Sequence, residues 1–281
     1  MYVSGHQIGA GLYEAVLHAR APVARLGARA SIGRRSLAMP GGVWQARLMF
    51  PIGDENPTLT TTWMAILLIV GNVVVWFWQL ALPAPATERL IWSAALVPAR
   101  LAGIVTTPGI PPAWTLVTSQ FLHGSVLHLG GNMLFLWIFG NNVEDRLGSI
   151  RFLFFYLLCG VAAGLVHFAT DPASRIPTIG ASGAISGVLG AYAVLFPRAR
   201  IRTLVILIFY ITIVELPALL WVALWFLAQL FGGFASRGAG GGVAWFAHIG
   251  GLFAGIALLV LFRPIRRPVP RQEPFSHTWR V

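Results

Sequence analysis

The sequence has no lysine, a single cysteine and few charged residues of either sign. Charged residues make up 10% of its 281 positions, and nine acidic residues stand against 20 arginines. A chain that is 57% hydrophobic carries more apolar surface than a soluble core of this size can bury, which excludes an ordinary soluble domain. The lone Cys159 excludes an intrachain disulfide. The composition therefore indicates an integral membrane protein.

Apolar runs recur along the chain at the length that a membrane helix needs. A hydrocarbon core about 30 Å thick requires roughly 20 apolar residues per helix. Six runs come close to this length, and we expect them to form the six spans of an all-α, polytopic bundle: about 62–82, 124–143, 149–170, 180–197, 216–232 and 242–262. The apolar segment 204–214 is only about half a span long, so we expect it to be re-entrant or interfacial.

Arginines are distributed unevenly between the six runs. The alternate loops hold one or two each, whereas clusters follow runs two, four and six: Arg146 and Arg151, then Arg198, Arg200 and Arg202, then Arg263, Arg266, Arg267 and Arg271. Because arginine-rich loops stay on the cytoplasmic side, we expect both termini to be cytoplasmic. The arginine-only usage favours a bacterial cell (inner) membrane. The arginines are not interleaved with aromatic residues, so the expected partner is the lipid bilayer and no nucleic acid.

Three regions differ in composition. Residues 1–48 hold six arginines and one acid, without an apolar signal core, and we expect a disordered extension or a misassigned start. The six-run domain is expected to occupy residues 49–262. Residues 263–281 are basic and are expected to form a cytoplasmic tail.

Four polar side chains from three runs are expected at one depth of the membrane. With the N-terminus inside, runs two, four and six all start at the outer face. His128 and Asn132 lie early in run two, four residues apart and therefore on one helix face. Ser182 opens run four, and His248 lies about two turns into run six. Polar groups in hydrocarbon are costly, so this cluster in the outer third is a candidate functional site.

Glycines spaced four apart follow the serine and the histidine. Such small-xxx-small pairs let helix backbones approach closely. Packing run four against run six along these two seams would bring Ser182 within reach of His248. The seams are Gly183 with Gly187 and Gly251 with Gly255.

A serine beside a histidine can perform nucleophilic catalysis. The imidazole removes the hydroxyl proton near neutral pH, and the oxyanion that forms on a carbonyl substrate needs hydrogen-bond donors. Asn132, His128 and the backbone N–H groups that start run four are the candidate donors. No aspartate lies within a run, so the sequence allows a Ser-His dyad rather than a triad.

Each of these residues also has an ordinary structural interpretation. A single serine near a helix start is usually an N-cap, and Ser186 has no stronger claim than that. A single histidine among apolar residues more often packs or forms a hydrogen bond, which is our expectation for His123 and His167. Four polar residues at one depth, with glycine seams on two of the helices, favour the catalytic interpretation of the others.

Three motifs resemble those of the rhomboid family of intramembrane serine proteases. They are GASG at 180–183, AHIGG at 247–251 and HGSVLHLGGN at 123–132, and the resemblance extends over about residues 49–262. It implies Ser182 as nucleophile, His248 as general base, His128 and Asn132 as oxyanion-stabilising residues, and neither a cofactor nor a metal. The implied substrates are single-pass transmembrane proteins, cut near the outer end of their transmembrane helix.

The resemblance includes residues around the site, with two departures. Glu144 and Arg146 resemble a cytoplasmic-side pair of the family, and the loop that contains Trp114 resembles its membrane-embedded first loop. Some members have Trp-Arg where this chain has Trp114-Thr115, and some have a tyrosine at the position of Ser186. Run five is the candidate mobile gate.

Other functions fit the sequence less well. A catalytically inactive rhomboid-like protein that binds membrane helices for quality control is the alternative, although such proteins usually lack the serine or the histidine. A transporter or channel would need polar residues that reach the inner face. A metalloprotease would need HExxH, which is absent, and an aspartyl enzyme would need two intramembrane aspartates. No sequence pattern indicates the oligomeric state.

Overall fold

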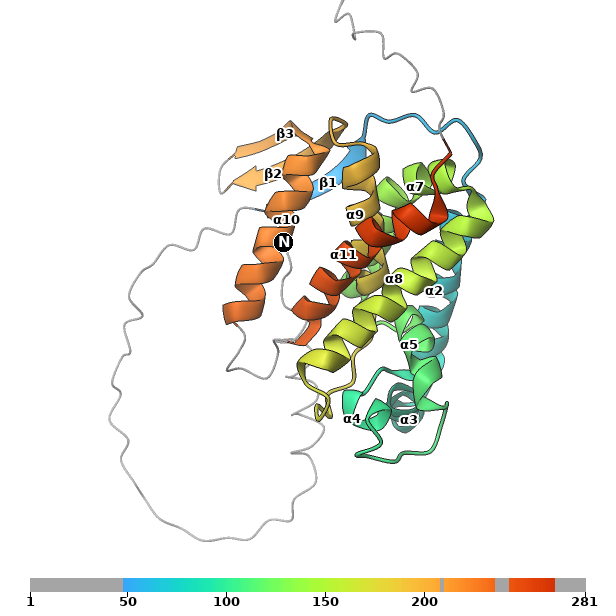
Figure 1. The fold of residues 1–281 in the computed structure, drawn as a ribbon. Helices are drawn as coiled ribbons and strands as arrows, with labels where there is room; N and C mark the ends of the chain where they lie inside the picture. The colour runs from blue at the N-terminus through green and yellow to red at the C-terminus, as the bar shows by residue number, and fades with distance from the viewer. Residues whose placement is uncertain (1–47, 208–209, 236–242, 266–281) are drawn as a thin grey trace, which may run out of the picture.

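The structure of the protein is a computed structural model that describes residues 48–207, 210–235 and 243–265. It is largely helical (Figure 1), as expected for an all-α bundle. The expected N-terminal extension, apart from Leu48, lies outside the described residues. So does the expected tail beyond residue 265.

Helices occupy each of the six expected runs. The first and third are α2 (Trp63–Ala81) and α8 (Ser149–Thr170), and the last is α11 (Val243–Phe262). The remaining runs form shorter or interrupted helices: α6 (Val126–Phe135) continuing through the π-helical turn η3 (Leu136–Gly140) into α7 (Asn141–Leu147), then α9 (Ser182–Leu195) and α10 (Ala218–Ala235).

Not all of these helices are equally suited to cross a membrane. Within the described ranges, three are long and apolar enough, namely Trp63–Ala81, Ser149–Thr170 and Trp245–Phe262. A fourth span results if Pro112–Phe121 and Val126–Leu147, which are bent by 85°, are taken together. Ser182–Leu195 and Ala218–Ala228 are apolar but shorter. The protein is therefore a multi-pass membrane protein.

The long connection between α2 and α6 contains short helices rather than a span. They are α3 (Ala84–Ala94), α4 (Pro98–Leu101), the 3-10 turns η1 (Pro112–Trp114) and η2 (Ser119–Phe121), and α5 (Thr115–Thr118). Proline begins or precedes several of these helices, where its missing N–H costs nothing because first-turn donors have no intrahelical partner.

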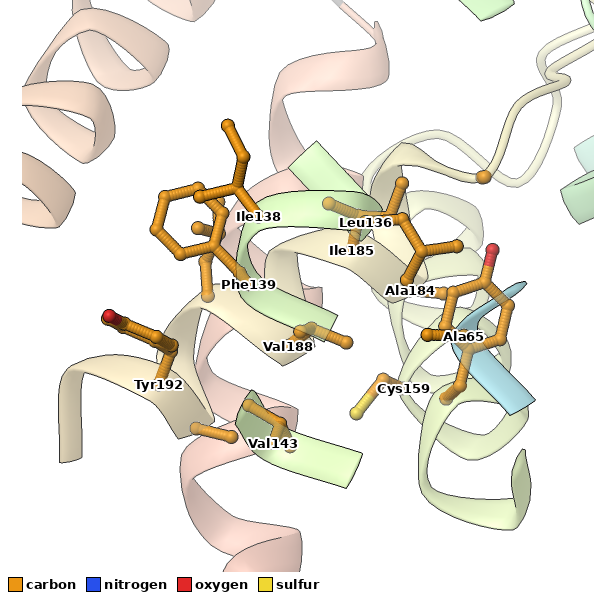
Figure 2. Packing of buried hydrophobic residues seen from close by; sticks show 14 of the residues in the cluster. Ala65, Leu136, Ile138, Phe139, Val143, Cys159, Ala184, Ile185, Val188 and Tyr192 are labelled. Atoms are coloured by element: carbon orange, nitrogen blue, oxygen red, sulfur yellow. The ribbon is translucent and has the colours of Figure 1, made fainter. Parts of the chain in front are cut away.

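Helix α9 lies at the centre of the molecule. Every residue from Ala184 to Ala193 is buried, as expected of a helix that is apolar or small on all sides. Figure 2 shows Ala184, Val188 and Tyr192 of this helix packed among side chains of neighbouring elements, including Phe139. The first residue of α9, Ser182, is therefore held by a helix that is buried along most of its length.

Three antiparallel strands form a small sheet at one end of the bundle, in the order β1 (Leu48–Asp54), β2 (Arg200–Leu207) and β3 (Tyr210–Pro217). The re-entrant alternative for 204–214 is wrong, because residues 204–207 and 210–214 form paired antiparallel strands β2 and β3; the interfacial alternative stays a prediction. Isoleucine, valine and threonine are abundant there, and β-branched residues favour strands. Strand β1 pairs with β2 from a distant part of the sequence.

The end of the bundle that carries the sheet, here called the sheet end, holds carboxylates that are well paired, among them the partly buried Asp54. Asp54 Oδ2 accepts hydrogen bonds from Tyr192 Oη at 2.6 Å and from Asn142 Nδ2 at 2.8 Å. Asn56 Nδ2 donates to the same tyrosine oxygen at 2.8 Å. These contacts fasten β1 to α7 and α9.

Glu144 performs a similar structural role beside α2. Its carboxylate accepts hydrogen bonds from the backbone N–H groups of Met64, at 3.0 Å, and Ala65, at 2.7 Å, and from Ser149 Oγ at 2.5 Å. First-turn N–H groups have no intrahelical acceptor, so this side chain supplies one for the start of α2. The chain then reverses at Gly148, whose φ of 81° suits glycine.

Candidate active site

The structure brings Ser182 and His248 together. Ser182 Oγ lies 2.7 Å from His248 Nε2. The residue before the helix, Ala181, is the N-cap of α9 and forms no side-chain capping bond, so the Ser182 hydroxyl is not used as a cap. When the imidazole is neutral with its proton on Nδ1, the hydroxyl donates to Nε2. This is the arrangement that a serine nucleophile and its base require.

Glycines set the distance between the two helices that carry these residues. A Cβ on Gly251 would overlap the carbonyl oxygen of Gly183, and a Cβ on Gly255 would overlap that of Gly187. A Cβ on Gly187 would also overlap the Cys159 side chain of α8. Helices α9 and α11 are therefore in backbone contact along both glycine seams, as small-xxx-small pairs allow.

Two tryptophans flank the imidazole. The ring centroid of Trp225, on α10, lies 6.1 Å from that of His248, and the centroid of Trp245 lies 6.3 Å away with the rings nearly perpendicular. Ser186, at the position where some rhomboids have tyrosine, instead donates its hydroxyl to the Ser182 carbonyl at 2.7 Å. Sequence reasoning missed Trp245, although a spacing of three residues from His248 on one helix was the available signal.

His128 and Asn132 lie next to Gly180, two positions before Ser182. A Cβ on Gly180 would stand 2.7 Å from His128 Nε2 and 3.7 Å from Asn132 Nδ2. Gly180 has a φ of 124°, so glycine is needed there both for its backbone conformation and for the space. The four residues singled out from the sequence therefore converge on one region from α6, α9 and α11.

The amide nitrogen of Asn132 stands out because it is buried and has no hydrogen-bond partner among the residues that the structure describes. Buried donors in native proteins are nearly always paired, so an unpaired one beside Gly180, close to the Ser182–His248 pair, is a candidate for binding a ligand oxygen. Its direction is fixed by α6, whose first turn is capped by Ser125 Oγ accepting from the His128 N–H at 3.1 Å.

The first loop is anchored by a residue that sequence reasoning overlooked. Arg100 is buried, and its guanidinium donates to the carbonyls of Trp92 at 2.8 Å, Ser93 at 3.0 Å and Ile110 at 2.7 Å. The absence of arginine after Trp114 therefore does not leave this loop without an anchor. Sequence reasoning had only the basic residue itself as a signal, because the carbonyls come from segments whose conformation it could not predict.

The segment before Ser182 is also fixed from two sides. Leu96 and Thr178 form an antiparallel bridge, and the Gly180 N–H donates to the Ser119 carbonyl at 2.9 Å. Thr178 Oγ1 lies 2.9 Å from Nε2 of the fully buried His167. His167 thus has a structural contact beside the site, in agreement with its ordinary interpretation. Among the described residues, no group of three or more His, Cys, Asp or Glu side chains could hold a metal ion.

The family model and the relatives that this chain matches all carry the same family name. Residues 111–265 match the model of the Rhomboid domain. The chain is 35% identical over 151 residues to "Rhomboid protein 1, mitochondrial" of Saccharomyces cerevisiae, covering 50% of this chain and 40% of that protein. It is 45% identical over 78 residues to "Rhomboid protease GluP" of Bacillus subtilis, covering 28% of this chain and 15% of that protein.

A third relative is the human "Presenilin-associated rhomboid-like protein, mitochondrial", with 33% identity over 99 residues, 34% of this chain and 26% of that protein. The matched regions thus cover well under half the length of these relatives. The Rhomboid model, in contrast, covers more than half of this chain and includes Ser182, His248, His128 and Asn132. The chain belongs to the rhomboid family.

Proposed function

We propose that the protein is an intramembrane serine endopeptidase that uses Ser182 and His248 as a catalytic dyad. The observation that carries the proposal is the 2.7 Å contact between Ser182 Oγ and His248 Nε2 in a chain of the rhomboid family. A serine hydroxyl is a poor nucleophile until a base removes its proton, and this imidazole is the base within reach.

The reaction follows from the positions of the donors. His248 takes the Ser182 proton as Oγ attacks the substrate carbonyl, and returns that proton to the leaving amine as the peptide bond breaks. Water then hydrolyses the acyl-enzyme with His248 again acting as base. Asn132 Nδ2, His128 and the backbone N–H groups at the start of α9 stabilise the oxyanion. No metal or cofactor takes part in this mechanism.

The proposed substrates are single-pass transmembrane proteins, cut near the outer face of the membrane. A helical peptide bond is shielded by its own hydrogen bonds, so cleavage needs a segment that unwinds where water can reach Ser182. The arginine-rich loops place both termini on the inner side. The mitochondrial names of two of these relatives lend no support to the expected bacterial inner membrane, so the proposal concerns the orientation of the chain in the membrane only.

Helix α10 is the proposed gate for the substrate. Its Trp221 packs on Phe135 of α6 with ring centroids 5.5 Å apart, so entry from the bilayer between these helices requires that contact to open. Replacing both residues by cysteine and joining them with a reducible bifunctional thiol crosslinker should abolish cleavage of a membrane substrate, and reduction should restore it. Undiminished cleavage by the crosslinked protein would remove α10 as the gate.

The decisive experiment is labelling of the detergent-purified protein with a fluorophosphonate serine probe. We expect the wild type to be labelled, Ser182→Ala to be unlabelled and His248→Ala to lose nearly all labelling. Ser186→Ala is the matched control, because this serine lies one turn further along α9 and should leave labelling intact. A folded wild type that is not labelled would point instead to an inactive rhomboid-like protein that binds membrane helices.

A further inference from the structure

The β2–β3 hairpin exposes aliphatic side chains that no other described element covers. Ile211 is 69% exposed and Ile213 is 56% exposed, although both lie in a paired strand. Opposite them on β2, the register places Ile206 against Ile211 and Leu204 against Ile213. Directly opposed residues of antiparallel strands lie on the same face of the sheet. One sheet face is therefore aliphatic toward the hairpin tip.

The same face becomes charged toward its base. Arg202 is opposite Glu215, and Arg200 Nη1 lies 3.3 Å from Glu215 Oε2. Three exposed arginines, the third being Arg198, stand here against two acids, Glu215 and the partly buried Glu55, which interacts electrostatically with Arg200, Arg202 and Glu215. Aliphatic residues toward the tip, followed by arginines toward the base of the hairpin, are the pattern of an element that lies at a membrane surface with anionic lipid.

The hairpin is also placed where a membrane surface would be. Figure 1 shows β2 and β3 extending sideways from the end of the bundle, roughly across the direction of α10. Strand β3 ends at Pro217 and α10 begins at Ala218, without a linker. The first turn of α10 exposes Leu219 and Leu220, so the charged base of the sheet lies between the aliphatic residues near the hairpin tip and the exposed aliphatic start of α10.

We propose that the aliphatic end of this face, formed by Leu204, Ile206, Ile211 and Ile213 and here called the tip, rests in the interfacial layer of the lipid bilayer, with Arg198 and Arg202 against anionic lipid phosphates. The layer is interfacial because β3 is an edge strand, whose unpaired N–H and C=O groups need water and are too costly to place in hydrocarbon. The lipid would thereby hold the sheet end of α10 at a fixed depth. The proposal is independent of whether Ser182 is a nucleophile.

Fluorescence in reconstituted vesicles tests the position of the tip. Ile211→Cys is labelled with a polarity-sensitive fluorophore in vesicles of phosphatidylcholine and phosphatidylglycerol; the native Cys159 is buried and should take up little label. Glu215→Cys is the matched control, two positions beyond Ile213 on the same strand face. We expect the label at 211 to emit at shorter wavelength, to be quenched severalfold more by a headgroup-attached quencher, and to be protected from iodide.

Two outcomes would overturn the proposal. Emission at long wavelength and full iodide quenching of the label at position 211 would show that the tip is in water. Protection from iodide without quenching by the lipid-attached quencher would show that protein, such as a second copy of the chain, covers the face.

A second comparison tests the role of the charges. In the double variant Arg198→Gln/Arg202→Gln, quenching of the label at 211 in vesicles containing phosphatidylglycerol should fall to the level seen in pure phosphatidylcholine. Arg175→Gln is the control, because it lies in the loop between α8 and α9, away from the sheet. Unchanged quenching in the double variant would remove anionic lipid from the proposal.

Discussion

Polar groups near the two ends of α9 differ in whether they have hydrogen-bond partners. At the sheet end, Asp54 accepts hydrogen bonds from Tyr192 and Asn142. At the other end, here called the site end, the Asn132 amide nitrogen is buried with no partner among the described residues. A satisfied buried group contributes to stability, whereas an unpaired one costs free energy and is retained where a ligand completes it.

Paired variants of two asparagines give the largest expected contrast. Asn132→Ala should lower the rate of substrate cleavage about 10²- to 10³-fold, because one oxyanion donor is lost, while thermal stability changes little. Asn142→Ala should instead lower thermal stability and change the cleavage rate little, since it removes the hydrogen bond to Asp54 Oδ2. Cleavage rates per folded molecule and melting temperatures in detergent measure both. Equal effects of the two variants on stability would contradict the stated difference between the sheet end and the site end of α9.

Removing the Glu144 carboxylate tests the sheet end more directly. Glu144→Ala leaves the N–H groups of Met64 and Ala65 without their acceptor, which should cost about 1–3 kcal/mol for each buried donor left unpaired. Ser149→Ala removes one hydrogen bond to the same carboxylate and should cost less. Melting temperatures in detergent rank the variants. A large loss of cleavage by the folded Glu144→Ala protein would contradict a purely structural role.

The smallest expected effect concerns pH. Burial raises the pKa of the Asp54 carboxyl above its ordinary value of 3.8, and the hydrogen bond from Tyr192 offsets part of this. A raised folded-state pKa means that protonated Asp54 favours folding: the contribution is complete below the unfolded pKa and is lost as pH rises through the folded pKa. Relative to wild type, Asp54→Asn should therefore gain stability as pH increases from about 4 to 7.

Thermal melts across this pH range measure the effect. Tyr192→Phe is the useful comparison, because it removes the hydrogen bond that lowers the pKa and should steepen the decline in stability with pH. A difference between wild type and Asp54→Asn that does not vary with pH would show that the carboxyl keeps its ordinary pKa in the folded protein.

The sequence predicted the helical runs well where the signal was local. The run expected at 149–170 is α8, and the serine and histidine motifs lie at the helix positions that spacing indicated. The β2–β3 hairpin was missed because an apolar run of this length suits a buried or interfacial segment of either kind. Arg100 was missed because its three acceptors are backbone carbonyls, which are the same in every residue.

The sequence by itself determined where the apolar helices lie, which residues are the candidate nucleophile and base, and where glycine permits close packing, since hydropathy and spacing are local properties. Tertiary structure alone decided that β1 pairs with β2, that Trp225 and Trp245 flank His248, and that the Asn132 amide is left unpaired near Ser182. Those features depend on contacts between segments far apart in the chain, and such contacts form only when the whole bundle packs.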